Sequence, residues 1–328
     1  ATLLNSLGEV TSGVPYGPND GDPDLPARMI PGSIVPVPWS GKPMGQAFFR
    51  IDGEDGGPFF ADPRTVLENA LRPLAKRGIR PVVATELEFY LLDGRRETIV
   101  AGAPKVPGTE RPQPGAQVYL PDDLFEVEGF LDDVYDWCAL QNVPAEAAIS
   151  EYSPGQFEIN LHHIDDAVLA CDHAVMLKRI IKAAARKHGF IACFMAKPFE
   201  EDSGNGLHIH MSLVDKEGVN YFSQGREKLG LPPFSARLRH AVGGLLKLMP
   251  ESTAITVRPR AAVTRGGGAN PDQIHGLVRM LADTQGITPA SALSRLAVAE
   301  CAGLTLGEAL TQVHDIQGKP TIGATAQL

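Results

Sequence analysis

The stretch PVVATELEFYLLD (residues 81–93) predicts a strand over residues 79–92. Successive side chains of a strand point to opposite faces, so Glu86 and Glu88 share one face while Leu87 and Phe89 share the other. Two carboxylates at this spacing lie about 6.6 Å apart and repel each other by about 2–3 kcal/mol at an effective dielectric constant of about 20. A partner cation would remove that cost, although an isolated pair of this kind also suits an ordinary solvated strand face.

The stretch EYSPGQFEINL (151–161) repeats the arrangement. It sets Glu151 and Glu158 on the two sides of a Pro-Gly turn, which predicts strands over 145–152 and 156–163. In the outgoing strand Gln156, Glu158 and Asn160 share one face, and the apolar residues between them cover the core side. A half-exposed sheet would show the same alternation.

A third stretch, SGNGLHIHMSL (203–213), places His208, His210 and Ser212 on one face of a strand. A single histidine in such a strand is more often a satisfied core residue than a ligand. The preceding Gly-x-Gly, however, lets the backbone approach a ligand closely, as it does in anion-binding loops.

Taken together, the three stretches supply four glutamates and one or two histidines near strand ends. Oxygen-rich sites with one imidazole suit Mg²⁺ or Mn²⁺ better than Zn²⁺, which takes mostly nitrogen and sulfur ligands. Two hard cations held in this way serve phosphoryl transfer. No Walker A sequence or kinase-type glycine-rich loop offers another way to hold a nucleotide.

The rest of the chain mixes helices and strands without regular β-α-β alternation, which predicts an α+β fold. A helix begins at Asp62-Pro63, with an N-cap followed by proline, and it bends at Pro73. Another helix is ended by Gly189. The expected helices cover residues 62–78, 120–140, 165–188, 235–249, 289–302 and 306–314, and further strands cover 45–51, 190–199 and 207–214.

Composition excludes several classes of protein. Among the 328 residues, 30 lysines and arginines against 39 aspartates and glutamates leave a formal net charge of −9, which argues against binding to nucleic acid. No apolar run approaches the roughly 20 residues of a membrane helix, and the first residues do not resemble a signal peptide. Four cysteines that lie far apart are too few for a disulfide framework, so we expect a cytoplasmic protein.

The order and the residues of these stretches resemble those of the glutamine synthetase family, most closely its γ-glutamylpolyamine synthetase branch. Weaker similarity extends from about residue 1 to Met249 and includes IPGSIVPVPW (30–39). The resemblance implies a catalytic domain with a curved antiparallel sheet and flanking helices over residues 62–328, of which 256–328 match the family poorly. Residues 1–61 would then be the remnant of an N-terminal β-grasp domain.

The resemblance also implies a role for each matching position. Glu88, Glu151 and Glu158 would bind the first metal, and Glu86 and His208 the second, with two or three Mg²⁺ or Mn²⁺ ions in each site. The implied substrate-binding positions are Gly204 and Ser203, where many relatives have asparagine, and the implied nucleotide-binding positions are Glu146, His210 and Ser212.

The implied reaction has two steps: glutamate and ATP give γ-glutamyl phosphate and ADP, and an amine then displaces the phosphate. A polyamine or another primary amine is favoured over ammonia, and a large ring-type homo-oligomer is expected. Ammonia as the acceptor, a non-catalytic homologue that only binds metal, nucleotide or glutamate, and, less strongly, a metal-dependent hydrolase remain alternatives.

Three parts of the family's apparatus have no counterpart in this sequence: the acidic loop that deprotonates the amine, the phosphate-binding arginines, and the segment that supplies the last metal glutamate. Arg265 is the one candidate remnant, beside Gly268-Ala269-Asn270-Pro271. These parts either lie in segments outside the given sequence or are truly absent, in which case phosphoryl transfer would lose about 10³-fold or more of its rate.

Overall fold

The structure, a computed structural model, describes residues 24–94, 118–223 and 235–256. The chain divides into two compact units. The first comprises Ala1–Phe194 and Gly206–Val219, and the second comprises Met195–Asn205 and Asn220–Leu328. The helices expected at 289–302 and 306–314 lie outside the described residues, as does Arg265.

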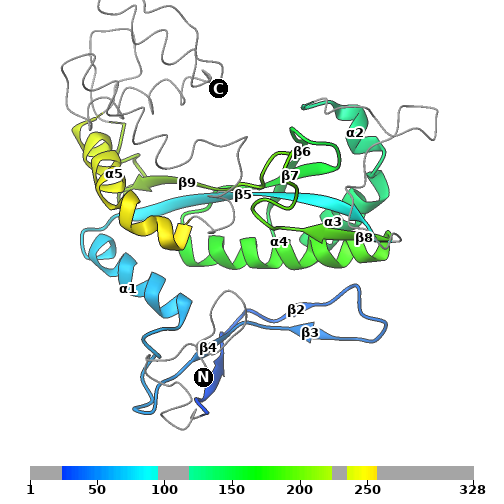
Figure 1. Cartoon of the computed structure of the whole chain (residues 1–328). Helices are drawn as coiled ribbons and strands as arrows, with labels where there is room; N and C mark the ends of the chain where they lie inside the picture. Colours follow the sequence, from blue (N-terminus) through cyan, green and yellow to red (C-terminus); the bar gives the residue numbers. More distant parts are fainter. Residues whose placement is uncertain (1–23, 95–117, 224–234, 257–328) are drawn as a thin grey trace, which may run out of the picture. The chain divides into compact units, whose positions relative to one another are not determined.

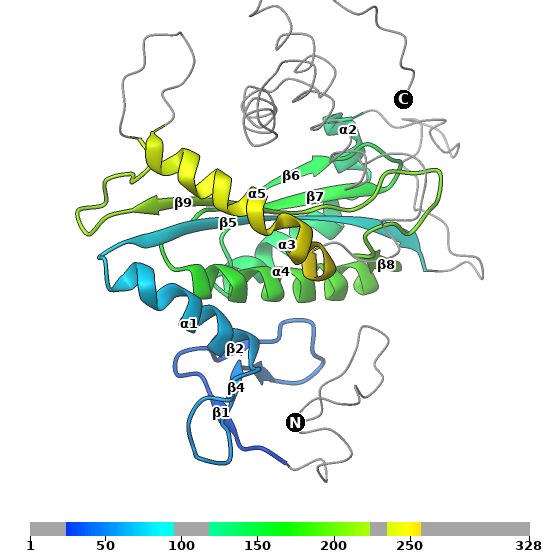
Figure 2. The same cartoon turned by 60° about the vertical axis from the view of Figure 1, so that its left-hand side comes forward.

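The first unit contains an antiparallel sheet in the order β6-β7-β5-β8, with β9 paired to β5 as well (Figure 1). The long strand β5 is the one predicted from the stretch quoted first, and it lies between β7 on one side and β8 and β9 on the other (Figure 2). The strands are β5 (Arg80–Asp93), β6 (Ala145–Ser150), β7 (Gln156–Leu161), β8 (Phe190–Cys193) and β9 (Leu207–Val214).

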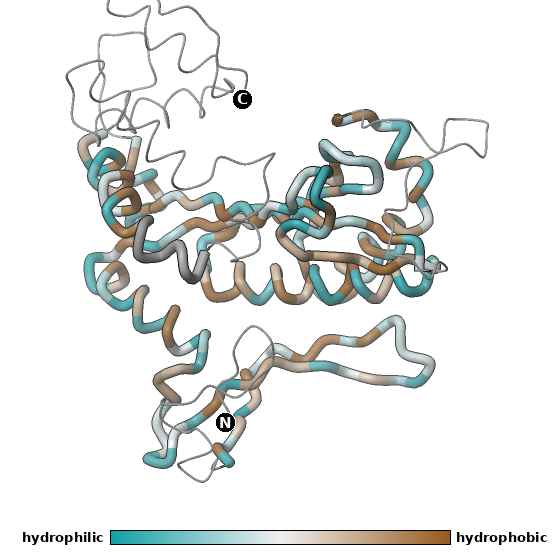
Figure 3. The backbone as a smooth tube through the Cα atoms, viewed as in Figure 1, coloured by the Kyte–Doolittle hydropathy of each residue, from teal (hydrophilic) through white to brown (hydrophobic). Residues whose placement is uncertain are grey.

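One face of this sheet packs on helices α3 (Glu128–Leu140) and α4 (Ala167–Lys187), with α4 running along β5 (Figure 1). Hydrophobic and hydrophilic residues alternate along α4 in Figure 3, as an amphipathic helix requires. Each fully buried large side chain contributes roughly 1.5–3 kcal/mol. The core contains, among others, Leu87, Phe89, Leu91, Phe130, Val134, Phe157, Ile159, Leu177, Ile180 and Ile181.

Helix ends follow the sequence signals. In α1 (Pro63–Ala75) the N-cap carboxylate of Asp62 accepts a hydrogen bond from the Thr65 amide at 3.0 Å, and Pro63 occupies the first helical position. In α4 the Asp166 carboxylate caps the first turn, and Gly189 follows the helix with a φ of 78°. A positive φ is easily adopted by glycine, which explains why the helix stops there.

Two predicted elements are divided in the structure. The helix expected over 120–140 is two helices, α2 (Pro121–Phe125) and α3, because the backbone at Val127 leaves helical geometry and its carbonyl starts a new helix. The strand expected over 45–51 is likewise two short strands in separate two-stranded sheets. The sheets pair β1 (Ala27–Met29) with β4 (Phe49–Ile51), and β2 (Val35–Pro36) with β3 (Gly45–Gln46).

Polar contacts hold the β2–β3 hairpin against the helices of the first unit. Gln141 donates from Nε2 to the carbonyl of Pro36 at 2.7 Å and accepts from Gln46 at 3.3 Å. The Trp39 and Trp137 rings pack with their centroids 5.3 Å apart. These contacts attach the β2–β3 hairpin to the first unit, while the assignment of residues 1–61 to a β-grasp remnant stays a prediction.

In the second unit, α5 (Ala236–Thr256) begins after Ser235, whose hydroxyl oxygen accepts from the Leu238 amide at 3.1 Å. The guanidinium of Arg237 lies 4.0 Å from the ring centroid of Tyr221. Within the described ranges, no helix combines the length and the apolarity needed to cross a membrane.

Candidate metal centre

Strand register brings the predicted ligands together on the face of the sheet that the core does not use. Glu86 of β5 lies opposite Asn160 of β7 on one side and opposite His208 of β9 on the other. Two residues along β5, Glu88 lies opposite Glu158 of β7. Residues separated by some 120 positions in the sequence therefore become neighbours across three strands.

Glu88, Glu151 and Glu158 form the first set, in which one carboxylate oxygen from each lies within 4.8 Å of the others. Glu151 follows the end of β6, where its amide donates to the carbonyl of Gln156 at 2.9 Å across the turn. Glu151 is only 8% exposed and Glu158 only 5%. Two carboxylates are thus largely withdrawn from water beside a third.

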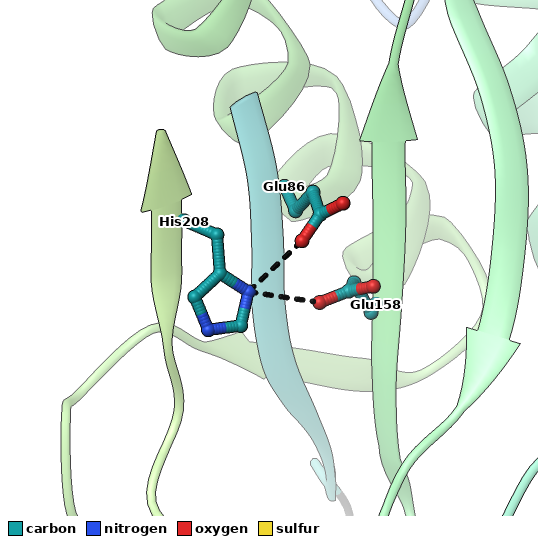
Figure 4. Close-up of side chains that lie close together, drawn as sticks. All are labelled: Glu86, Glu158 and His208. Atoms are coloured by element: carbon teal, nitrogen blue, oxygen red, sulfur yellow. Dashed lines mark hydrogen bonds and ion pairs between the residues drawn. The ribbon is translucent and has the colours of Figure 1, made fainter. Parts of the chain in front are cut away.

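Glu86, Glu158 and His208 form the second set (Figure 4). Nδ1 of His208 lies 2.9 Å from Glu86 and 3.6 Å from Glu158, each measured to the nearer carboxylate oxygen. Because Glu158 belongs to both sets, the two candidate cation positions adjoin each other.

Backbone and amide donors fix the orientation of Glu88. Its Oε2 atom accepts from the amide of Gly206 at 2.9 Å and from Nε2 of Gln156 at 3.2 Å. A Cβ atom on Gly206 would lie 2.8 Å from Oε1 of Glu88 and 2.9 Å from Nε2 of His208, which is closer than such atoms approach. Only glycine fits this position without moving both ligands.

The electrostatics of the sets reflect crowded negative charge. Burial first, and then the charges of Glu88 and Glu158, raise the pKa of Glu151 from its usual 4.5 to about 7. Burial also raises the pKa of Glu88, against the Gly206 amide that lowers it. The carboxylate of Glu158 first, and then the hydrogen bond with Glu86, raise the pKa of His208 to about 9 against burial, which lowers it.

The donor chemistry of both sets fits a hard divalent cation. Carboxylate oxygens with at most one imidazole are ligands that Mg²⁺ and Mn²⁺ accept. Within the described part of the chain, the ion pairs of Glu86, Glu88 and Glu158 are all made with imidazoles, so no lysine or arginine there neutralises them. These residues could therefore hold metal ions.

The remaining predicted residues lie in several places. His210 pairs with the second set, since its Nε2 lies 2.9 Å from Oε1 of Glu86. Ser212 lies opposite Val82 farther along β9. On β6, Glu146 contacts Nδ1 of His162 at 3.4 Å, with both side chains exposed.

Ser203 and Gly204 lie on the loop between β8 and β9, in the second unit. A Cβ atom on Gly204 would meet the carbonyl oxygen of Ala196 at 2.7 Å, and the Asn205 amide donates to that same oxygen at 2.8 Å. The loop therefore closes on itself tightly enough to require glycine at this position.

The structure also places near the two sets residues to which the sequence prediction assigned no role. Tyr119 has a φ of 62°, is 62% exposed, and donates from its amide to the carbonyl of Ser150, the residue before Glu151. Burial and the nearby charge of Glu151 raise the pKa of its phenol. Nothing in the sequence indicates that Tyr119 adopts a left-handed backbone. The alternation of polar and apolar residues along β7, by contrast, could have indicated that Gln156 and Asn160 share a face with Glu158.

Comparison with known proteins agrees with this geometry. The family described as "Glutamine synthetase, catalytic domain" matches residues 60–263. The chain is 40% identical over 253 residues to "Gamma-glutamylputrescine synthetase PuuA" of Escherichia coli (strain K12), covering 77% of this chain and 52% of the relative. It is 30% identical over 256 residues to "Glutamate--isopropylamine ligase" of Pseudomonas sp, covering 77% of this chain and 54% of the relative.

A solved structure titled "GmaS/ADP complex-Conformation 1" superposes with a TM-score of 0.61 at 27% identity, covering 71% of this chain and 50% of the other. The chain thus spans about half the length of the relatives that it matches. The fold confirms the expected α+β class with an antiparallel sheet and flanking helices. Since the catalytic-domain match covers more than half of the chain, the protein belongs to the glutamine synthetase family.

Proposed function

We propose that this protein is an ATP-dependent ligase that joins the γ-carboxylate of glutamate to an amine. One observation carries the proposal: two sets of metal-ligating side chains share Glu158 on one face of the sheet. In the proposed reaction the γ-carboxylate takes the γ-phosphoryl group of ATP, which gives γ-glutamyl phosphate and ADP. The amine nitrogen then attacks the acyl carbon, phosphate leaves, and the nitrogen loses a proton.

In this proposal Glu88, Glu151 and Glu158 hold one divalent cation, and Glu86, Glu158 and His208 hold another. Bound Mg²⁺ or Mn²⁺ would neutralise phosphate charge and align the phosphoryl group for in-line transfer. The chain contributes the orientation of the ligands: the Gly206 amide and Gln156 fix Glu88, and the turn before β7 fixes Glu151. Rigid placement of this kind is what positional catalysis requires.

For the acceptor we propose a primary amine or polyamine rather than ammonia. The two relatives named above act, by their names, on putrescine and isopropylamine. The exposed side chains of Tyr119, whose phenol feels the charge of Glu151, and of Tyr152, the residue after Glu151, offer aromatic surface to a cation.

The remaining assignments are proposals by family membership. Gly204 and Ser203 would contact glutamate, and Glu146, His210 and Ser212 would contact the nucleotide. We further propose that the working protein is cytoplasmic and forms a large ring-type homo-oligomer, as expected for the family.

ADP release tests the proposed function. The protein is mixed with ATP, Mg²⁺ and glutamate, and ammonia, putrescine, spermidine and isopropylamine are added one at a time. We expect ADP release that needs both glutamate and an amine, with putrescine or spermidine more effective than ammonia. The Glu88→Gln variant should lose this activity while remaining folded, since the substitution keeps the shape of the side chain.

Two results would contradict the proposal in different ways. Turnover with ammonia at low KM and no response to any larger amine would identify a glutamine-forming enzyme. Thermal stabilisation by Mg²⁺-ATP without ADP release in any mixture would identify a non-catalytic homologue that only binds its ligands.

A further inference from the structure

Asn160 of β7 has a buried side-chain oxygen without a hydrogen-bond partner among the residues that the structure describes. Its Oδ1 atom is shielded from solvent, and no donor among the described residues reaches it. Buried acceptors without a partner are destabilising and rare in folded proteins. This oxygen therefore needs a hydrogen-bond donor that the described chain does not supply.

Its position in the sheet indicates what that donor is. Asn160 lies directly opposite Glu86, which in turn lies opposite His208. Side chains directly opposite one another on neighbouring strands are about 5 Å apart at Cβ, and Asn160 shares its face with Glu158, two residues earlier on β7. Asn160 thus stands at the edge of the second set, beside Glu86 and on the side away from His208.

The second set needs such an acceptor. Glu86, Glu158 and His208 give a cation only three protein ligands. Mg²⁺ prefers six ligands in near-octahedral geometry and keeps several waters, and Mn²⁺ is accepted by similar oxygen-rich sites. A cation polarises its waters and makes them strong hydrogen-bond donors. An amide oxygen beside Glu86 is suited to accept from one of them, as groups surrounding a metal site commonly do.

We propose that Asn160 is a positioning residue of the second set, and that its Oδ1 accepts a hydrogen bond from a water in the hydration shell of the bound cation. The inference rests on the proposed function, because it requires that Glu86, Glu158 and His208 hold a divalent ion. Asn160 would orient that water and, through it, the cation, without itself touching the reacting groups.

Thr85 provides a matched control. Its Oγ1 atom is also buried without a partner, and Thr85 is only 5% exposed. It is the neighbour of Glu86 on β5 and therefore points to the opposite, core-facing side of the sheet. Thr85→Val and Asn160→Leu each remove one unpaired buried oxygen with little change of shape, but only the second change removes it beside the metal set.

The experiment measures Mn²⁺ binding to EDTA-treated protein by the electron paramagnetic resonance signal of free Mn²⁺, together with the melting temperature of the metal-free protein. For Asn160→Leu we expect about 10–100-fold weaker binding to the second set and a metal-free melting temperature that is unchanged or higher, because an unpaired acceptor is gone. Thr85→Val should leave Mn²⁺ affinity at the wild-type value. Asn160→Asp, which keeps an acceptor oxygen, should restore binding.

Three results overturn the inference and can be told apart. Wild-type affinity in Asn160→Leu would remove the role of Asn160 while leaving the metal centre intact. A melting temperature lowered by several degrees in metal-free Asn160→Leu would show that Asn160 serves the fold. Absence of Mn²⁺ binding by the wild-type protein would refute the metal centre itself, and with it the proposed function.

Discussion

Glu158 is the side chain on which both candidate cation positions depend. It is 5% exposed, it lies opposite Glu88 in the sheet, and it approaches His208 across the intervening strand β5. Burying a carboxylate beside other carboxylates costs free energy unless charge is supplied to balance it. Single residues of this site therefore favour ligand binding at the expense of the stability of the metal-free protein.

Glu151→Gln tests whether a buried carboxylate of this site favours metal binding but destabilises the metal-free protein. The pKa of Glu151 is raised from 4.5 to about 7, so its ionisation destabilises the metal-free folded protein increasingly as the pH rises through 7. At pH 8 the neutral glutamine should raise the free energy of unfolding by about 1–3 kcal/mol and abolish binding to the first set.

Urea denaturation in EDTA at pH 8 and at pH 5 measures this effect. At pH 5 the glutamate is protonated in the folded protein, so most of the loss has not yet occurred and the stability difference between the two proteins should be much smaller than at pH 8. A variant that is less stable than wild type at pH 8 would contradict the electrostatic account.

Gly206→Ala tests the close backbone approach. The added Cβ would lie 2.8 Å from Glu88 and 2.9 Å from His208, so it should displace a ligand of each set. We expect Mn²⁺ affinity to fall by about tenfold or more. In Gly243→Ala, where nothing lies within 4 Å of the new Cβ in α5, Mn²⁺ affinity should stay unchanged. Equal affinity of Gly206→Ala and wild type would show that the loop relaxes freely.

Strands β5, β7 and β9 bring the site together at the level of elements. Alternation within each strand could be predicted from the sequence, and so the shared face of Glu86 and Glu88 and that of Gln156, Glu158 and Asn160 are both confirmed. Register between strands could not be predicted, because it depends on packing between segments far apart in the chain. The family resemblance implied that Glu86 and His208 share a metal, and the structure adds that they lie directly opposite each other on β5 and β9.

Two other features could not be predicted from the sequence, for physical reasons. Residues 120–140 are rich in apolar side chains throughout, and that pattern does not reveal a change of backbone direction at Val127. The ion pair between His210 and Glu86 was likewise not predicted, while the place of His210 on the nucleotide side stays a proposal. Which carboxylate an exposed histidine contacts on the neighbouring strand depends on the strand register, so this partner is revealed only by the fold.

Helix α4 packs on the core-facing side of the sheet whose other face carries the metal sets. Its N-cap residue, Asp166, gives a prediction about the stability of this helix. Asp166 accepts hydrogen bonds from the amides of Val168 and Leu169, both at 3.0 Å. Asp166→Ala should lower the free energy of unfolding by about 1 kcal/mol.

The neighbouring Asp165 is the control for that cap. Its carboxylate makes only an exposed ion pair with Arg80. Asp165→Ala should therefore change stability by less than about 0.5–1 kcal/mol. Equal losses in the two variants, measured by chemical denaturation, would show that the cap contributes nothing beyond surface charge.

At the scale of the whole molecule, pH should govern how strongly a metal stabilises the protein. The raised pKa of Glu151 gives stability that is present below pH 4.5 and lost as the pH rises through 7. The raised pKa of His208 gives stability that is present below pH 6.5 and lost as the pH rises through 9. Between pH 6 and 9 both groups therefore release protons and become available as ligands.

Saturating Mg²⁺ should consequently raise the melting temperature more at pH 9 than at pH 6, and the difference should amount to several degrees. Thermal unfolding with and without Mg²⁺ across this range measures the effect. An increment that is constant or shrinks with rising pH would mean that these two groups do not bind the metal.

If two cations share Glu158, each chain should bind two Mn²⁺ ions, and both should depend on that carboxylate. Titration followed by electron paramagnetic resonance should give two ions per wild-type chain, and Glu158→Gln should weaken the binding of both. Glu126→Gln, at an exposed position before α3, should bind as wild type does. Fewer than two ions in the wild-type protein, or unchanged binding in Glu158→Gln, would contradict the account.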